Sequence, residues 1–243
     1  MRWYQTIWGL ILLVLMAILA VGVIIFSAIT IKYWWQIKHG QGNTLFQSVY
    51  NGFDYDPTVQ RNSSAAVDKD TLEKGDFPFL GNPNAPITVV LFGDFRCPNT
   101  KKAWPIIQRL MGQYAYKVKL IYRQFPEQSI HPGANELSQL GMCAYAQGQD
   151  KYWGVHNYLF TKQDELPTYL ASADIAALAQ ETGLDMAKLN QCLSSSQALI
   201  KINRDYADGI RFGVGGTPTF FINGQKIEGV IPWEAWDAFI KQF

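Results

Sequence analysis

One cysteine, Cys97, lies where an apolar segment gives way to a helical pattern. The segment before it, residues 87–92 (ITVVLF), is β-branched and apolar throughout, as in a strand buried on both faces. At the start of a helix, a thiolate is stabilised by the helix dipole and by free backbone N–H groups. Pro98 suits the first helical turn, because the N–H that proline lacks has no partner there. Position alone does not distinguish a reactive thiol from an inert buried cysteine, because free cysteines are among the most buried residues.

A second feature lies far along the chain, in residues 215–219 (GGTPT), at the start of the apolar segment 219–222 (TFFI). Proline is tolerated at the entrance to a strand. A cis bond between Thr217 and Pro218 would make a tight turn and expose the backbone of Thr217 to an extended peptide. Alone, this pattern is also typical of an ordinary turn.

Together the two features resemble the thioredoxin superfamily, and more closely its DsbA-like branch with a helical insertion, the thioredoxin-4 type. The resemblance covers about residues 81–243. It rests on four segments in order: GNPNAPITVVLFGDFRCPNT (81–100), RQFPEQSIHPGA (123–134), CAYAQGQDKYWGVHNYLF (143–160) and GVGGTPTFFINGQKIEGVIP (213–232). The resemblance implies that Cys97 is the attacking nucleophile and Pro218 a cis-proline, and that Pro98, Thr217 and Pro218 contact the substrate.

The chain departs from the family's Cys-Pro-x-Cys motif at Thr100, where the family has a second, resolving cysteine. A disulfide within the motif cannot form, but attack on a substrate disulfide needs only one thiolate. An external thiol, from a small molecule or a protein, must then resolve the mixed disulfide. The Thr100 hydroxyl could donate a hydrogen bond to the Cys97 thiolate, so we include Thr100 among the catalytic residues.

Two functions fit this altered motif. The first is a monothiol thiol-disulfide oxidoreductase or isomerase that acts on unfolded or disulfide-containing polypeptides. The alternative is a redox-inactive thioredoxin-like module that binds peptides, or acts as a chaperone, at the Pro218 edge. The presence of Cys97 favours the enzyme, and the loss of the resolving cysteine favours the module. Neither function implies a cofactor.

The other two cysteines, Cys143 and Cys192, lie 49 positions apart in a helical region. They are candidates for a structural disulfide, because some relatives in the resembling family pair cysteines in similar places; two separate buried thiols are the alternative. A bridge would stabilise the fold by roughly 3–4 kcal/mol in the loop-closure model. It would also indicate an oxidising compartment.

The histidines His39, His131 and His156 form no metal-ligand pattern, and the chain contains neither C-x-x-C nor H-E-x-x-H. We therefore predict no metal site and interpret His131 and His156 as structural. Asp94, three residues before Cys97, is interpreted as a residue that caps the turn.

The remaining pattern predicts the architecture. A strand at 117–125 follows the first helix, and an Asn-Gly turn joins strands 219–222 and 225–230. Between these lie amphipathic helices at 134–147, 151–161, 172–182, 186–194 and 197–212, and a last helix spans 234–242. The order is β-α-β, a helical block, then β-β-α. This predicts an α/β thioredoxin-like fold with a helical insertion at about residues 130–212.

The amino-terminal region has a different character. Residues 7–31 contain no charge and are long enough, as a helix, to cross the roughly 30 Å hydrocarbon core. Aromatic residues flank both ends, as at membrane interfaces, and a signal peptide would have a shorter apolar stretch. We predict an uncleaved anchor in residues 1–39 that contacts membrane lipid, a linker at 40–78, and one domain at 79–243.

Composition excludes other classes. A hydrophobic content of 48% excludes a disordered chain, and a net charge of +1 provides no field to attract nucleic acid. The charges that flank the apolar run are balanced, so they do not decide orientation. The possible disulfide favours an extracytoplasmic domain on a single-pass anchor whose amino terminus is cytoplasmic.

Overall fold

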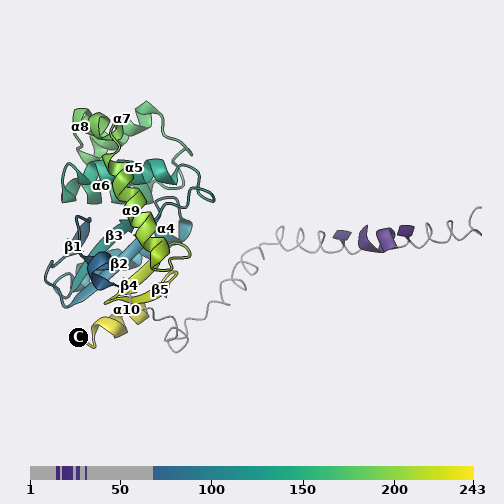
Figure 1. The fold of residues 1–243 in the computed structure, drawn as a ribbon, viewed down its shortest axis with the longest axis horizontal. Helices are drawn as coiled ribbons and strands as arrows, with labels where there is room; N and C mark the ends of the chain where they lie inside the picture. Colours follow the sequence, from purple (N-terminus) through teal and green to yellow (C-terminus); the bar gives the residue numbers. More distant parts are fainter. Residues whose placement is uncertain (1–14, 17, 24–25, 28–30, 32–67) are drawn as a thin grey trace, which may run out of the picture. The chain divides into compact units, whose positions relative to one another are not determined.

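The computed structural model describes residues 15–16, 18–23, 26–27, 31 and 68–243 (Figure 1). The chain divides into two units, residues 1–59 and 60–243. The described residues of the first unit are helical and nearly all exposed. Among the described residues, no helix combines the length and the hydropathy that a membrane span requires. Most of the predicted anchor at 7–31, and the predicted linker up to residue 67, lie outside the described residues.

The second unit is built on a five-stranded sheet in the order β1-β3-β2-β4-β5. Strands β2 and β3 are parallel, and the other neighbours are antiparallel. Helix α4 connects the two parallel strands, as such a crossover requires. The strands are β1 (Phe79–Gly81), β2 (Ile87–Gly93), β3 (Val118–Gln124), β4 (Thr219–Ile222) and β5 (Gln225–Glu228).

Helices cover the sheet and form the predicted insertion. Between β3 and β4, helices α5 to α9 follow one another without a strand, which is the predicted helical block (Figure 1). The helices of this unit are α3 (Lys69–Glu73), α4 (Pro98–Tyr114), α5 (Ala134–Tyr145), α6 (Gln149–Thr161), α7 (Ser172–Thr182), α8 (Met186–Leu193), α9 (Gln197–Arg211) and α10 (Trp233–Ile240).

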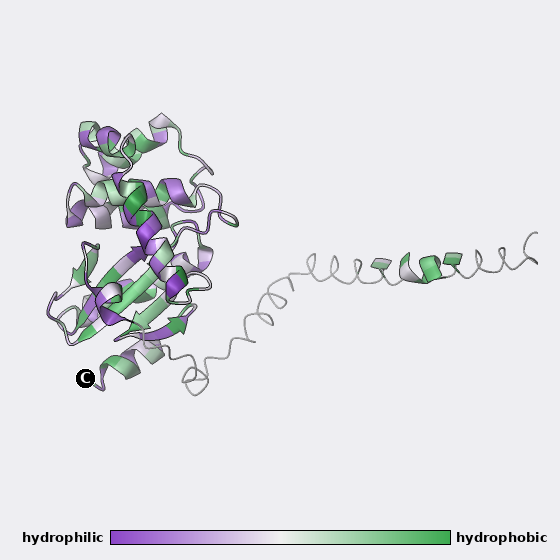
Figure 2. Cartoon of the chain, in the orientation of Figure 1, coloured by the Kyte–Doolittle hydropathy of each residue, from purple (hydrophilic) through white to green (hydrophobic). Residues whose placement is uncertain are grey.

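Strand β2 contributes to a core on each face of the sheet. Its alternate residues point to opposite sides. Val89 and Leu91 join the larger core, which includes α4 and α10, whereas Val90 and Phe92 join a smaller core with Leu72 of α3. Figure 2 shows hydrophobic stretches in the sheet, beside hydrophilic ones. Burial on both faces explains the uninterrupted apolar sequence of β2.

The folded domain begins before residue 79. Asp68 caps α3 by accepting a hydrogen bond from the backbone N–H of Asp70 at 3.1 Å, and Leu72 of this helix is fully buried. Phe77 is also buried. The linker prediction is therefore wrong for residues 68–78. It failed because a five-residue helix with one core side chain has too little periodicity to be recognised in the sequence.

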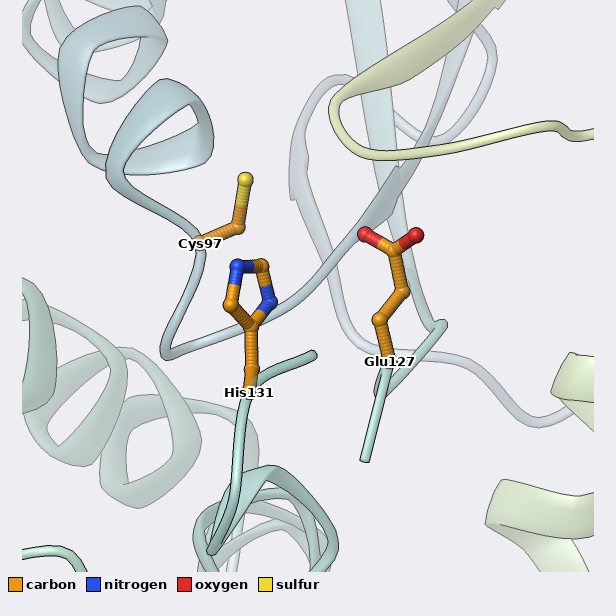
Figure 3. A group of neighbouring side chains, drawn as sticks. All are labelled: Cys97, Glu127 and His131. Atoms are coloured by element: carbon orange, nitrogen blue, oxygen red, sulfur yellow. The ribbon is translucent and has the colours of Figure 1, made fainter. Parts of the chain in front are cut away.

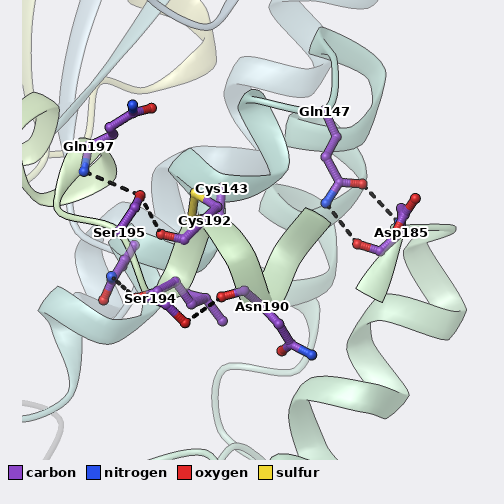
Figure 4. Close-up of a disulfide and its surroundings, with 10 residues drawn as sticks. Cys143, Gln147, Asp185, Asn190, Cys192, Ser194, Ser195 and Gln197 are labelled. Carbon is purple, nitrogen blue, oxygen red and sulfur yellow. Dashed lines mark hydrogen bonds between the residues drawn. A yellow bond between two sulfur atoms is a disulfide. The ribbon is translucent and has the colours of Figure 1, made fainter. Parts of the chain in front are cut away.

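Helices α5 and α8 are joined by a disulfide between Cys143 and Cys192, the pair proposed from the sequence (Figure 4). The side-chain amide of Gln147 adds two hydrogen bonds to the backbone of Asp185, accepting from its N–H at 2.8 Å and donating to its carbonyl at 3.1 Å. Asp185 caps the start of α8 and Cys192 lies near its end. The end of α8 is therefore fixed to α5 through Cys143, and its start is fixed to Gln147, just after the C-cap of α5.

Removal of this disulfide is expected to destabilise the domain. We predict that the Cys143→Ala/Cys192→Ala variant loses about 3–4 kcal/mol in free energy of unfolding, because the unfolded chain regains the entropy of an open loop. Urea unfolding of the full chain in detergent, followed by tryptophan fluorescence, measures this loss. A variant as stable as the unaltered chain would contradict the prediction.

Candidate active site

Three chain segments meet at one edge of the sheet. The last residue of β2, Gly93, pairs with the last residue of β3, Gln124. Near the same edge, Phe92 pairs with Thr219, the first residue of antiparallel β4. The segments that follow β2, follow β3 and precede β4 therefore lie side by side. The carboxyl ends of parallel strands are where α/β sheets commonly bind ligands.

Cys97 occupies the N-cap position of α4, and Pro98 is the first helical residue. The cysteine is 4% exposed. Its Sγ donates a hydrogen bond to the carbonyl oxygen of Thr217 at 3.1 Å, and the Thr217–Pro218 peptide bond is cis. The structure thus brings together the two features that the sequence placed 120 residues apart.

Thr100 does not make the predicted contact. It is 1% exposed in the first turn of α4, and its hydroxyl has no hydrogen-bond partner. The expectation that this hydroxyl donates to Cys97 is therefore wrong. In this structure the Cys97 sulfur is bonded to the Thr217 carbonyl instead.

Asp94 organises the site from a fully buried position. Its carboxylate accepts hydrogen bonds from the backbone N–H groups of Arg96 at 2.7 Å and Glu127 at 3.0 Å, so it caps the turn as predicted. It also bonds Nδ1 of His131 at 2.7 Å. This hydrogen bond raises the pKa of His131 above its ordinary value. One carboxylate thus joins the turn after β2 to the loop after β3.

Glu127 and His131 lie beside the thiol (Figure 3). The Cys97 Sγ, one carboxylate oxygen of Glu127 and one ring nitrogen of His131 all lie within 4.8 Å of one another. The Oε2 atom of Glu127 also accepts a hydrogen bond from the Thr217 hydroxyl at 2.9 Å. Although Cys97 is buried, polar groups therefore line one side of its sulfur. These three residue types could hold a metal ion.

No sequence motif pointed to Glu127, and the sequence pattern favoured a structural role for His131. Neither residue belongs to a spaced motif with Cys97. The available signal was topological: both residues follow β3, and two neighbouring strands connected by a helix, as in the predicted β-α-β order, run parallel. Residues after neighbouring parallel strands meet at one edge.

The helical insertion also holds the active-site turn. The Gln163 side chain, which follows α6, donates hydrogen bonds to the carbonyls of Phe95 at 2.8 Å and Cys97 at 3.1 Å. Arg96 donates to the carbonyl of Thr168 at 2.8 Å. These contacts fix the position of Cys97 from outside the sheet and α4.

His156 is a core residue, as predicted. It is fully buried, and its ring lies 4.1 Å from that of Trp104, centroid to centroid. Neither ring nitrogen has a hydrogen-bond partner, and burial lowers the pKa of His156 well below its ordinary value. A neutral imidazole among aromatic rings accounts for its position. His39 lies outside the described residues.

Comparison with known proteins supports this architecture. A family model described as thioredoxin, of the thioredoxin-4 type, matches residues 73–242. The solved structure of α-DsbA2, a thiol-disulfide exchange protein from Wolbachia pipientis, has the same fold, with a TM-score of 0.64 and 20% identity over 72% of this chain and 90% of that one. A thioredoxin-like oxidoreductase from Silicibacter pomeroyi has a TM-score of 0.62 and 25% identity over 72% of this chain and 96% of that one. BdbD from Bacillus subtilis has a TM-score of 0.62 and 22% identity over 69% of this chain and 92% of that one.

Curated relatives match over part of their length. The Na+/H+ antiporter NhaA 1 of Salinispora arenicola is 31% identical over 158 residues, which cover 65% of this chain and 23% of that protein. The Na+/H+ antiporter NhaA of Herminiimonas arsenicoxydans is 26% identical over 149 residues, 61% of this chain and 22% of that protein. The chain therefore spans less than a quarter of the length of these relatives.

Proposed function

Because the chain belongs to the thioredoxin family, thioredoxin-4 type, and has the fold of DsbA-like thiol-disulfide oxidoreductases, we propose that it catalyses monothiol thiol-disulfide exchange at Cys97. The contact between Cys97 Sγ and the Thr217 carbonyl carries this proposal. It places the sulfur of the N-cap residue of α4 against the backbone beside a cis-proline, where an extended substrate can pair with the backbone of Thr217.

Exchange begins when the Cys97 thiol loses its proton. Cys97 lies at the N-terminus of α4, and the hydrogen bond from its thiol to the Thr217 carbonyl is lost with the proton. That carbonyl is then free to accept a hydrogen bond from the substrate backbone. A ring nitrogen of His131 lies within 4.8 Å of the Cys97 sulfur, so one water molecule could carry a proton between them.

The thiolate next attacks one sulfur of a substrate disulfide. A bond forms between Cys97 and that sulfur, the substrate S–S bond breaks, and the departing thiolate takes up a proton. Because residue 100 is threonine, a thiol from a small molecule or another polypeptide must attack the mixed disulfide. This second step regenerates Cys97 and leaves the external thiol bonded to the substrate.

The setting proposed for this chemistry is extracytoplasmic and membrane-bound. The uncharged run at residues 7–31 supports a single-pass anchor whose amino terminus is cytoplasmic. The Cys143–Cys192 disulfide supports an oxidising compartment for the domain. Relatives named Na+/H+ antiporters support a membrane setting. The partners would be disulfide-containing polypeptides, a resolving thiol and lipid.

Reaction with oxidised glutathione tests the proposal. Cys97 is the free thiol among the three cysteines, so we expect one glutathione per chain, bound at Cys97, when the folded full chain is incubated near neutral pH. Mass spectrometry of the intact chain and of its peptides measures the adduct, and Cys97→Ser is the control. A folded chain that forms no adduct would contradict the enzyme and favour the peptide-binding alternative.

A further inference from the structure

The side chains of Cys97, Glu127 and His131 offer a sulfur, an oxygen and a nitrogen to one small volume. Their donor atoms lie within 4.8 Å of one another. Zn²⁺ binds this combination of thiolate, imidazole and carboxylate ligands, commonly with three protein ligands and a fourth position left for water or substrate. In a tetrahedral zinc site such donors lie about 3.4–3.6 Å apart. Small side-chain rotations would therefore bring these atoms to binding distance.

The surroundings of His131 support a metal ligand independently of that spacing. Its Nδ1 is bonded to the buried carboxylate of Asp94 at 2.7 Å, which leaves Nε2 as the nitrogen able to bind an ion. Asp94 is itself held by the backbone N–H groups of Arg96 and Glu127. A histidine whose second nitrogen is bonded to a carboxylate is the usual arrangement around protein-bound zinc, because it fixes the ring orientation and raises its basicity.

Glu127 is positioned in a similar way. Its Oε2 accepts the hydrogen bond of the Thr217 hydroxyl at 2.9 Å, and this leaves Oε1 able to bind an ion. Glu127 and His131 are half-buried, so an ion can reach the site from solvent. Two of the three ligands thus have partners that orient them, and the third, Cys97, occupies the N-cap position of α4.

We propose that Cys97, Glu127 and His131 form a binding site for one Zn²⁺ ion. On binding, the Cys97 thiol releases its proton to solvent and a zinc–thiolate bond forms. Zinc fits better than calcium or magnesium, which take oxygen ligands. Because bound zinc occupies the Cys97 sulfur, it also blocks attack on disulfides. The site needs an accessible thiolate but not catalytic turnover, so it does not depend on the proposed exchange activity.

Zinc titration of the full chain in detergent tests this site. The chain carries no polyhistidine tag, Cys97 is kept reduced under anaerobic conditions, and affinity is read by competition with a chromophoric chelator. We expect one Zn²⁺ per chain. With Co²⁺ as a spectroscopic probe, we expect a near-ultraviolet thiolate-to-cobalt charge-transfer band. A reduced, folded chain that binds no zinc, or a Co²⁺ complex without this band, overturns the proposal.

Variants assign the ligands. Cys97→Ser should abolish the cobalt band, and Glu127→Gln and His131→Gln should each weaken zinc binding by at least about tenfold. Glu181→Gln, an exposed substitution on α7, should bind zinc like the unaltered chain. Circular dichroism verifies that each variant is folded. Unchanged affinity in either folded Glu127→Gln or folded His131→Gln overturns the three-ligand site.

A competition experiment separates zinc binding from exchange. Zn²⁺ should slow the alkylation of Cys97 in the unaltered chain by at least about tenfold at saturation, and much less in His131→Gln. This readout requires no disulfide exchange. A chain that binds zinc but forms no glutathione adduct would contradict the proposed function alone, whereas alkylation that is insensitive to Zn²⁺ would contradict the metal site alone.

Discussion

When treated with oxidised glutathione, which is then removed, Thr100→Cys is expected to hold a disulfide with Cys97 and to raise oxidation of a reduced, unfolded protein by at least about tenfold over the unaltered chain. The substitution restores the Cys-Pro-x-Cys motif that the thioredoxin-4 resemblance implies. A disulfide within the motif can be transferred to a substrate dithiol, which a single cysteine cannot do without an external oxidant. Recovery of activity by a reduced, unfolded ribonuclease measures the gain.

The local structure favours this substitution. Residues three positions apart lie on the same side of a helix, and disulfides span Cα separations of about 4.4–6.8 Å. The Thr100 hydroxyl has no hydrogen-bond partner, so its replacement by sulfur breaks no polar contact. Because Thr100 is 1% exposed, a thiol of similar size fits better there than a larger group would.

Asn99→Cys is the matched control, because a residue two positions from Cys97 does not face it. That variant should form no disulfide with Cys97 and show no gain in oxidation. If Thr100→Cys forms the disulfide, remains folded and still does not oxidise the substrate, the prediction fails. The defect would then lie in the binding of substrate to the backbone of Thr217 rather than in the missing sulfur.

The sequence predicted most elements whose own pattern was strong. The limits of β4 and α7 agree with the predicted ranges, and β2, β3 and α5 differ from prediction by two residues or fewer at each end. Strand β1 was missed because its three residues pair with the edge of β3 and have no pattern of their own. Short elements of this kind depend on tertiary contacts.

Only those site residues that belong to a short sequence motif could be predicted. Cys97 and Pro218 were recognisable, and the structure places Cys97 against Thr217. Glu127 and His131 could not be assigned by spacing, because their roles depend on which strands are neighbours. The wrong expectation for the Thr100 hydroxyl has a similar origin. Sequence position places that residue near Cys97 but does not determine its side-chain orientation.

A second large effect, on the stability of the domain, is expected at a buried ion pair near the end of β3. Arg123 of β3 is fully buried, and its Nε donates to Asp205 of α9 at 2.9 Å. Asp205 also accepts the backbone N–H of Gln124 at 3.0 Å. This pair joins the helical insertion to the end of β3, three residues before Glu127. Burial raises the pKa of Asp205 to about 6, against the lowering effect of Arg123.

We predict that Asp205→Ala lowers the free energy of unfolding by about 3–5 kcal/mol, because it removes a partner of a buried guanidinium. The measurement is urea unfolding at pH 8, where the Asp205 carboxylate is ionised. The double variant Arg123→Met/Asp205→Ala should lose less, since no buried arginine remains without this partner. Lys74→Ala, which removes an exposed ion pair with Asp70, should cause no measurable loss.

The double variant also separates stability from chemistry. The hydrogen bonds of Arg123 and Asp205 go to each other and to Thr71, Gln124 and Asp208. Arg123→Met/Asp205→Ala should therefore react with oxidised glutathione at the rate of the unaltered chain where both are folded. A loss of reactivity in a folded sample would mean that the pair positions the loop that carries Glu127. If Asp205→Ala is as stable as Lys74→Ala, the stability prediction is wrong. Asp208, which also contacts Arg123, would then be sufficient to compensate the buried charge of the arginine.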